Sequence, residues 1–193
     1  LWSETDSAIT RSVTVEIQGL DTNYDLVVQE ATTDATDSTT EVTLTTALRR
    51  VFRIKVYDDT TMDQNLRVGP SGKANFQAQV STGWNQTRMA IYTVPNGKVG
   101  YMTQYYASQN KVSGGGDPAT NISVWARDNV NGYAPLLKHT IGMDQAGTSH
   151  FAHPFKPYFK IPAKHDIWIE AENLSGTAVA DVDAGFDIIL EDA

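Results

Sequence analysis

The sequence contains no cysteine. This absence excludes thiol nucleophiles, thiolate metal sites and a disulfide framework. Because secreted eukaryotic β domains commonly carry disulfides, it favours a microbial or viral source. The chain also has no apolar run long enough to span a bilayer. No signal peptide is present and the first residue is Leu1, so we expect that part of the native N-terminus is missing.

Positive charge is scarce and scattered. The chain has 15 Lys and Arg against 23 Asp and Glu, a net charge of −8, and Arg49-Arg50 is the only adjacent basic pair. Nucleic acids and anionic membranes are bound through clustered Lys and Arg. We therefore predict neither a nucleic-acid partner nor a membrane partner.

Signatures of catalysis are missing as well. The sequence has no Gly-x-Ser-x-Gly, no phosphate-binding loop and no dinucleotide fingerprint. His150 and His153 are three residues apart, a spacing that points two side chains to opposite faces of a strand. His139 and His165 stand apart from them. We predict that the protein is not an enzyme, with no catalytic residues and no cofactor.

Two groups of aspartates are candidate calcium sites. Asp181 and Asp183 would share one face of a strand, and Asp58, Asp59 and Asp63 lie in a polar loop. Calcium takes roughly six to eight oxygen ligands, more than either group supplies. Solvated carboxylates explain both groups, so no metal site is predicted.

Hydrophobic residues alternate with polar ones at period two along most of the chain. Val13, Val15 and Ile17 show it first, and Val42 and Leu44 repeat it between threonines. Such segments recur about every ten residues between turn clusters, and helical spacing is hard to find.

This pattern predicts an all-β protein, an antiparallel β-sandwich of jelly-roll-like type. We assign residues 1–85 to an N-terminal β segment, which can belong to the same body. Residues 86–193 are assigned to the jelly-roll-like sandwich.

A proline turn occurs twice. Val94-Pro95 precedes Asn96-Gly97, and Ile161-Pro162 precedes Ala163-Lys164. Proline cannot donate a ladder hydrogen bond, so it ends the strand before each turn. We expect the strands that flank the first turn to form a hairpin.

The aromatic residues supply the candidate contact site. Trp84 lies with Asn85 in a polar turn, where a large indole has little reason to be unless it packs or binds. Adjacent strand residues point to opposite faces, so Tyr105-Tyr106 would present one ring outward. Sugars stack on exposed aromatic rings. Trp84, Asn85, Tyr105 and Tyr106 are therefore predicted to contact a glycan or a neighbouring subunit.

Five segments of the chain resemble structural proteins of tailed bacteriophages, especially phages of marine and cyanobacterial hosts. These segments are Val13–Tyr24, Leu48–Ile54, Gln86–Lys98, Phe155–Pro162 and Asp183–Leu190. The resembling segments are spread over most of the chain, from Val13 to Leu190. The resemblance rests on strand and turn patterns and carries no catalytic residues with it.

The resemblance implies a virion protein, most simply a capsid decoration or cement protein that stabilises the phage head. Its partners would be copies of itself, as in a trimer, and the major capsid protein or another virion protein. One alternative is a tail or head-fibre module that binds host surface glycans through Trp84, Tyr105 and Tyr106. A carbohydrate-active enzyme, or its detached binding module, is the other.

Overall fold

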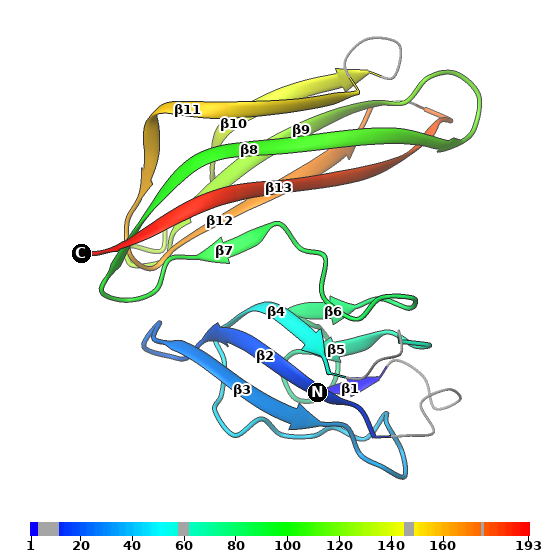
Figure 1. Cartoon of the computed structure of the whole chain (residues 1–193), viewed down its shortest axis with the longest axis vertical. Helices are drawn as coiled ribbons and strands as arrows, with labels where there is room; N and C mark the ends of the chain where they lie inside the picture. The colour runs from blue at the N-terminus through cyan, green and yellow to red at the C-terminus, as the bar shows by residue number, and fades with distance from the viewer. Residues whose placement is uncertain (4–11, 58–61, 145–148, 175) are drawn as a thin grey trace. The chain divides into compact units, whose positions relative to one another are not determined.

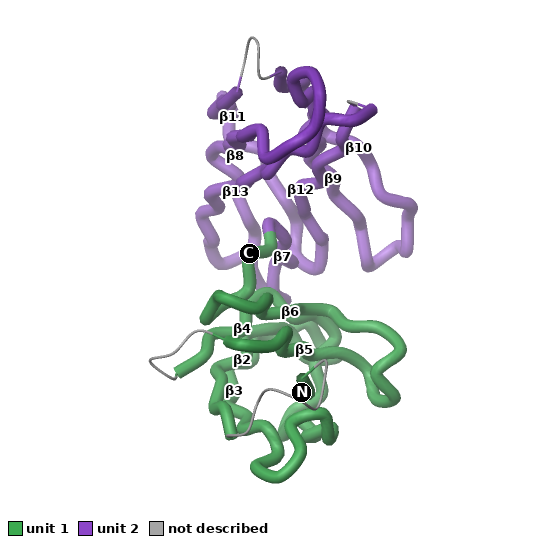
Figure 2. The backbone as a smooth tube through the Cα atoms, turned by 90° about the vertical axis from the view of Figure 1, so that its right-hand side faces the viewer, with its two compact units in different colours: residues 1–89 green, residues 90–193 purple. Residues whose placement is uncertain are grey.

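The computed structural model describes residues 1–3, 12–57, 62–144, 149–174 and 176–193. These residues form thirteen β-strands and no helix, and every strand pair among them is antiparallel (Figure 1). The chain divides into two compact units (Figure 2), unit 1 from Leu1 to Met89 and unit 2 from Ala90 to Ala193. The predicted all-β antiparallel fold is thereby confirmed.

Unit 1 contains two three-stranded sheets, ordered β1-β5-β6 and β3-β2-β4. Its strands are β1 (Trp2–Ser3), β2 (Thr14–Leu20), β3 (Leu26–Thr32), β4 (Arg50–Val56), β5 (Leu66–Val68) and β6 (Ala78–Val80). The alternation that predicts β2 has a direct cause, because Val15 and Ile17 are fully buried while Glu16 and Gln18 are partly exposed.

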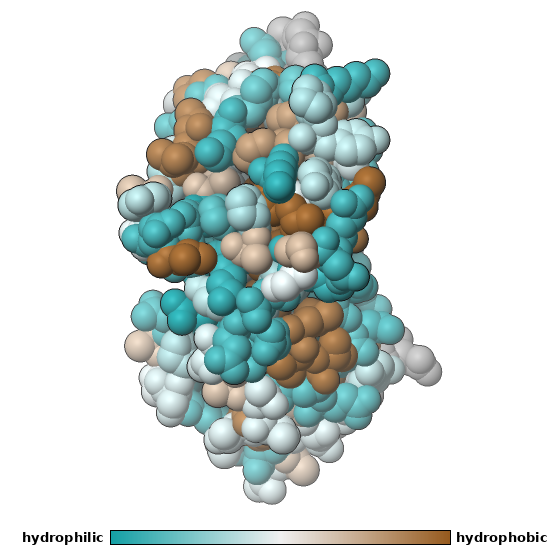
Figure 3. Space-filling view, turned by 90° about the vertical axis from the view of Figure 1, so that its left-hand side faces the viewer, coloured by the Kyte–Doolittle hydropathy of each residue, from teal (hydrophilic) through white to brown (hydrophobic). Residues whose placement is uncertain are grey.

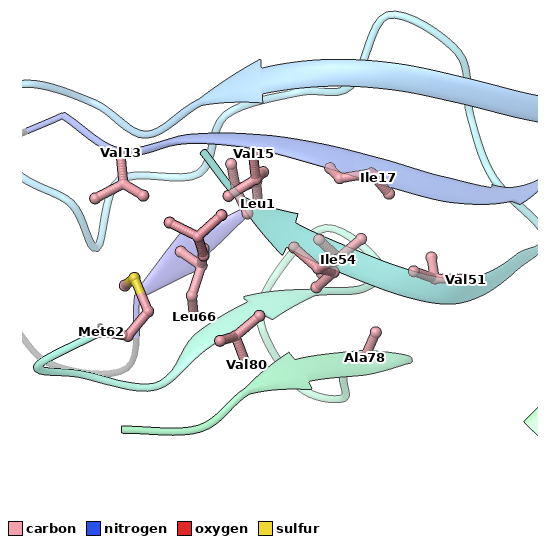
Figure 4. Packing of buried hydrophobic residues seen from close by; sticks show 12 residues of the cluster. Leu1, Val13, Val15, Ile17, Val51, Ile54, Met62, Leu66, Ala78 and Val80 are labelled. Atoms are coloured by element: carbon pink, nitrogen blue, oxygen red, sulfur yellow. The ribbon is translucent and has the colours of Figure 1, made fainter. Parts of the chain in front are cut away.

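Unit 1 has its own hydrophobic core (Figure 4), which draws residues from both of its sheets. Ile17 of β2 and Ile54 of β4 face Leu66 of β5 and Val80 of β6, and all four are inaccessible to solvent. Burying an aliphatic side chain of this size stabilises the fold by about 1.5–3 kcal/mol. No residue after Met89 belongs to this cluster among the described residues.

The strand expected around Val42 and Leu44 is not present. A few separate hydrogen bonds hold this segment instead. The Val42 amide donates to the Leu1 carbonyl at 2.9 Å, and the Leu1 amino group donates to the Val42 carbonyl at 3.0 Å. The Gln29 side chain also bonds both the amide and the carbonyl of Thr46, each at 2.9 Å. Backbone bonds to Leu1 and side-chain bonds from Gln29 therefore replace the strand ladder that the alternation predicted.

Unit 2 is a sandwich of two antiparallel sheets, β10-β9-β12-β7 and β11-β8-β13. Its strands are β7 (Ile91–Thr93), β8 (Lys98–Ser113), β9 (Ala119–Asp128), β10 (Leu136–Asp144), β11 (His150–Ile161), β12 (His165–Asn173) and β13 (Val179–Asp192). Its core lies between the sheets and includes Met102, Ile122, Val124 and Ile167, all fully buried.

The strand order of unit 2 is that of a jelly roll with seven strands instead of eight. Of the six connections between its described strands, only the one from β9 to β10 joins neighbours in one sheet. All the others cross from one sheet to the other. In a complete jelly roll an eighth strand lies beside β13. Among the described residues nothing pairs there, so β13 has an open edge.

The two proline turns are not hairpins, which corrects the expectation for the first of them. β7 and β8 lie in different sheets, and so do β11 and β12. Each turn is therefore a corner where the chain changes sheets. The corners bond to each other, because Val94 accepts from the Lys164 amide at 2.7 Å and donates to the His165 carbonyl at 3.0 Å.

Candidate functional site

Trp84 lies in an exposed turn of unit 1, and its side chain is 45% exposed. Gly83 adopts a φ of 83°, which turns the chain. The turn is tied to Met62, whose carbonyl accepts from the Gly83 amide at 2.6 Å and whose amide donates to the Trp84 carbonyl at 2.9 Å. These backbone bonds fix the turn that carries the indole at the surface.

The Arg88 guanidinium covers one face of the Trp84 indole, with its central carbon 4.1 Å from the ring centroid. Such an exposed cation–π contact stabilises by about 0.5–1 kcal/mol. Asn85 is exposed beside it, and its carbonyl accepts from the Val56 amide at 2.8 Å. The next side chain, Gln86, accepts from Arg53 at 2.8 Å. The turn therefore presents an aromatic ring within a hydrogen-bonding polar rim.

Tyr105 and Tyr106 point to opposite faces of β8. Tyr105 is fully buried between the sheets, whereas Tyr106 is 43% exposed on the outer face. The Tyr106 ring lies across Gly185 of β13, where an added Cβ would come within 2.8 Å of the tyrosine hydroxyl. Tyr106 can make an outside contact, but the predicted contact role of Tyr105 is wrong because no partner can reach it.

Tyr105, which is fully buried, instead forms a cluster with two half-buried histidines. Its hydroxyl hydrogen-bonds the Nδ1 of His139 on β10. The rings of His139 and His153 stack with centroids 4.3 Å apart and an interplanar angle of 24°. Phe151 meets Tyr105 edge-on at 5.2 Å. Sequence spacing could not show this cluster, because the two histidines come from β10 and β11, in different sheets.

Burial shifts the pKa values of Tyr105 and His139 in this cluster. It raises the pKa of Tyr105 to about 12, so the phenol keeps its proton at neutral pH. Burial, followed by the repulsion of His153, lowers the pKa of His139. The Nδ1 of a neutral His139 can accept a hydrogen bond from the Tyr105 hydroxyl. A neutral His139 ring can also stack on His153 without charge repulsion. The arrangement is that of a packing cluster sensitive to acid.

The fourth histidine, His165, lies at the second proline corner. Its Nε2 is 3.8 Å from a carboxylate oxygen of Asp128. The pKa of Asp128 is lowered mainly by the hydrogen bonds that Asn131 donates to its carboxylate. The electrostatic attraction of His165 lowers this pKa further. The neighbouring Asp166 is buried and accepts the hydroxyl of Thr93 at 2.6 Å. These groups join the end of β9 to the corner of the sandwich.

The predicted acidic groups do not assemble further. Asp181 and Asp183 lie exposed on β13, and Asp63 is exposed in unit 1, while Asp58 and Asp59 lie outside the described residues. Within the described part of the chain, no three His, Cys, Asp or Glu side chains form a group that could hold a metal ion. No helix there is long and apolar enough to cross a membrane.

Both units carry hollows. One in unit 1, of about 340 Å³, is lined mainly by apolar residues that include Leu1, Trp2 and Leu48. One in unit 2, of about 260 Å³, is lined by Tyr133 and Phe159, among others. Tyr105, His139 and His153 line neither of these two hollows.

The chain matches no family model, no curated protein and no solved structure.

Proposed function

We propose that the protein is a structural component of a virion, a capsid decoration protein that acts through contacts with copies of itself and with the shell. The observation that carries the proposal is the strand order of unit 2. Seven antiparallel strands in two sheets follow the jelly-roll order, an architecture used by viral capsid domains. The resemblance to tailed-phage structural proteins supports the same proposal.

The surface of unit 2 suits a protein that works by association. The long strand β13 ends its sheet with an open edge, and open edges are templates for contact with another chain. Apolar side chains such as Tyr106, Tyr158 and Ile189 are exposed. On one face of the molecule, small groups of apolar residues lie among polar ones (Figure 3). Such groups favour burial against a partner.

Cryo-electron microscopy of purified particles, with and without the protein, tests the proposal. Regular density over the local symmetry axes of the head, lost when the protein is removed, is the expected result. Density confined to the tail or to a single vertex would replace decoration with a fibre or connector role. Complete absence of the protein from the particles would overturn a virion role.

A glycan-binding fibre module is the second candidate, and the Trp84 turn favours it. The indole has one face covered by Arg88 at 4.1 Å, yet 45% of the residue stays exposed. An aromatic face beside amide side chains such as Asn85 matches the way proteins hold sugar rings, by stacking and by hydrogen bonds to hydroxyls. Of the two tyrosines named for this candidate, Tyr106 is exposed, and Tyr105 is excluded from it because it is fully buried.

A further inference from the structure

The two edge strands of the three-stranded sheet of unit 2, β11 and β13, carry opposite charges. β13 carries acidic side chains and no Lys or Arg. We define the acidic edge as Asp181, Asp183, Asp187 and Glu191. β11, on the other side of β8, carries Lys156 and Lys160 and has no acidic residue.

β10 extends the positive charge of β11. The stacked rings of His139 and His153 place β10 and β11 together at one side of the sandwich. Lys138 of β10 lies with its Nζ 5.8 Å from the centroid of Phe159 on β11. We define the basic edge as Lys138, Lys156 and Lys160. β10 and β11 together hold one acid, Asp144, at the far end of β10.

Both edges also expose apolar side chains. On the acidic edge these are Val179, Ile189 and Leu190. Beside the basic edge they are Leu136, Leu137 and Tyr158. The hollow of about 260 Å³ lies here too, lined by Lys138, Lys160 and Phe159 among others. Each edge therefore combines apolar area, which favours burial, with charge, which selects the partner.

We propose that the acidic edge of one copy of this chain docks against the basic edge of a second copy. Charge complementarity identifies the occupant, because each edge meets its opposite on another copy. Two acidic edges would repel each other, and so would two basic edges. A contact between two different surfaces is heterologous, and it closes into a ring such as a trimer when its rotation allows.

The contact rests on side chains more than on a continuous sheet. β11 contains Pro154 and Pro157, which lack the amide hydrogens that an added strand would need. Its pairing with β8 is also irregular between Pro154 and Phe159. Within unit 2, Asp187 already accepts the amide of Gln104 at 2.6 Å, which holds its carboxylate in place on the sheet.

The inference rests on the proposed function for the expectation that copies associate, and its test is separate. One variant reverses the acidic edge, Asp187→Lys with Glu191→Lys. A second reverses the basic edge, Lys156→Glu with Lys160→Glu. A matched control, Asp117→Lys with Glu172→Lys, makes the same change of charge at exposed positions of unit 2 away from both edges.

Size-exclusion chromatography with light scattering, over a series of concentrations, measures association of the full chain. The wild type and the control should form the same oligomer. Each reversed variant alone should dissociate, with a roughly 10- to 100-fold higher dissociation constant. An equimolar mixture of the two reversed variants should reassemble into pairs or larger even-numbered assemblies, because every contact between unlike variants joins opposite charges. An odd-numbered ring such as a trimer would keep one contact between like charges. Circular dichroism confirms that all variants are folded.

Three results would overturn the inference. The wild type could be monomeric throughout, the folded reversed variants could associate like the wild type, or their mixture could fail to reassemble. A monomeric protein that still decorates particles would leave the decoration role standing, carried by contacts with the shell. Restored assembly in the mixture, with no protein in the particles, would leave the inference standing and remove the proposed function.

Discussion

The face of a strand or turn on which a side chain lies decides whether it is exposed or buried in this protein. Trp84 is held outward by backbone bonds to Met62 and is covered on one face by Arg88. Tyr105 is turned inward and bonds His139.

Trp84→Ala should separate the two candidate functions. The residue is exposed, and its contact with Arg88 contributes only about 0.5–1 kcal/mol. For a decoration protein we expect unchanged oligomerisation and unchanged incorporation into particles. Binding to host cells or to a glycan array, measured in parallel, should stay at the wild-type level. Loss of cell binding with assembly intact would favour the fibre module.

Acidification should destabilise unit 2 through His139. The pKa of His139 is lowered in the folded protein from its usual 6.5, so below that pH the unfolded chain binds more protons than the folded chain. The free energy of unfolding should therefore fall as the pH drops below 6.5, until the lowered pKa is passed. Above 6.5 it should not change through this group.

Urea unfolding between pH 7.5 and pH 5, monitored for unit 2, measures this dependence. In His139→Gln the slope should flatten, since glutamine does not titrate over this range. Tyr105→Phe removes only the hydroxyl bonded to His139, and it should cost about 1 kcal/mol at neutral pH. An equally steep slope in His139→Gln would rule out this histidine as the cause.

At the scale of strands, close backbone contact decides where side chains are tolerated. β2 and β4 shift register between Gln18 and Gly19. A Cβ added at Gly19 would lie 2.1 Å from the carbonyl oxygen of Arg50, on the neighbouring strand. Gly142, inside β10, has no such obstacle, because its nearest contact would be Asn121 at 3.7 Å. These two glycines form a matched pair.

Gly19→Ala should lower the free energy of unfolding of unit 1 by about 1–3 kcal/mol, because the backbone must shift to admit the methyl group. Gly142→Ala should change stability by less than about 1 kcal/mol. Chemical denaturation of both variants provides the comparison. Equal effects of the two substitutions would contradict the close contact between β2 and β4.

At the scale of the whole molecule, the two hydrophobic clusters contain no common residue. The cluster of unit 1 ends at Met89, and that of unit 2 begins at Tyr92 among the described residues. A unit that buries its own core carries its own share of the folding free energy. The two units should therefore behave as separate cooperative bodies.

Ile54→Ala should destabilise unit 1 by about 2–5 kcal/mol and leave unit 2 unchanged, and Ile122→Ala should do the reverse. Both residues are fully buried in their own clusters. Hydrogen exchange with mass spectrometry reports each unit separately in the full chain. Residues 90–193 expressed alone should also fold. Matching loss of protection in both units, from either variant, would show that they unfold together.

The all-β fold class follows from the residue pattern of the chain, because alternation at period two decides which residues a strand buries. The sequence also marks Trp84 as a candidate contact, because a large aromatic side chain in a polar turn has few apolar neighbours to bury it. The proline turns were located correctly, but their role as corners between sheets was not predicted. A proline ends a strand without saying which sheet the next strand joins.

Tertiary structure alone decided the rest. Val42 and Leu44 show the alternation of a strand, yet bonds from Leu1 and Gln29 hold their segment in another conformation. His139 and His153 are 14 positions apart and stack at 4.3 Å, because β10 and β11 lie at one side of the sandwich. β11 and β13, which carry opposite charges, are the two edge strands of one sheet because both pair with β8. Contacts between distant strands depend on pairing partners, and no local pattern encodes those partners.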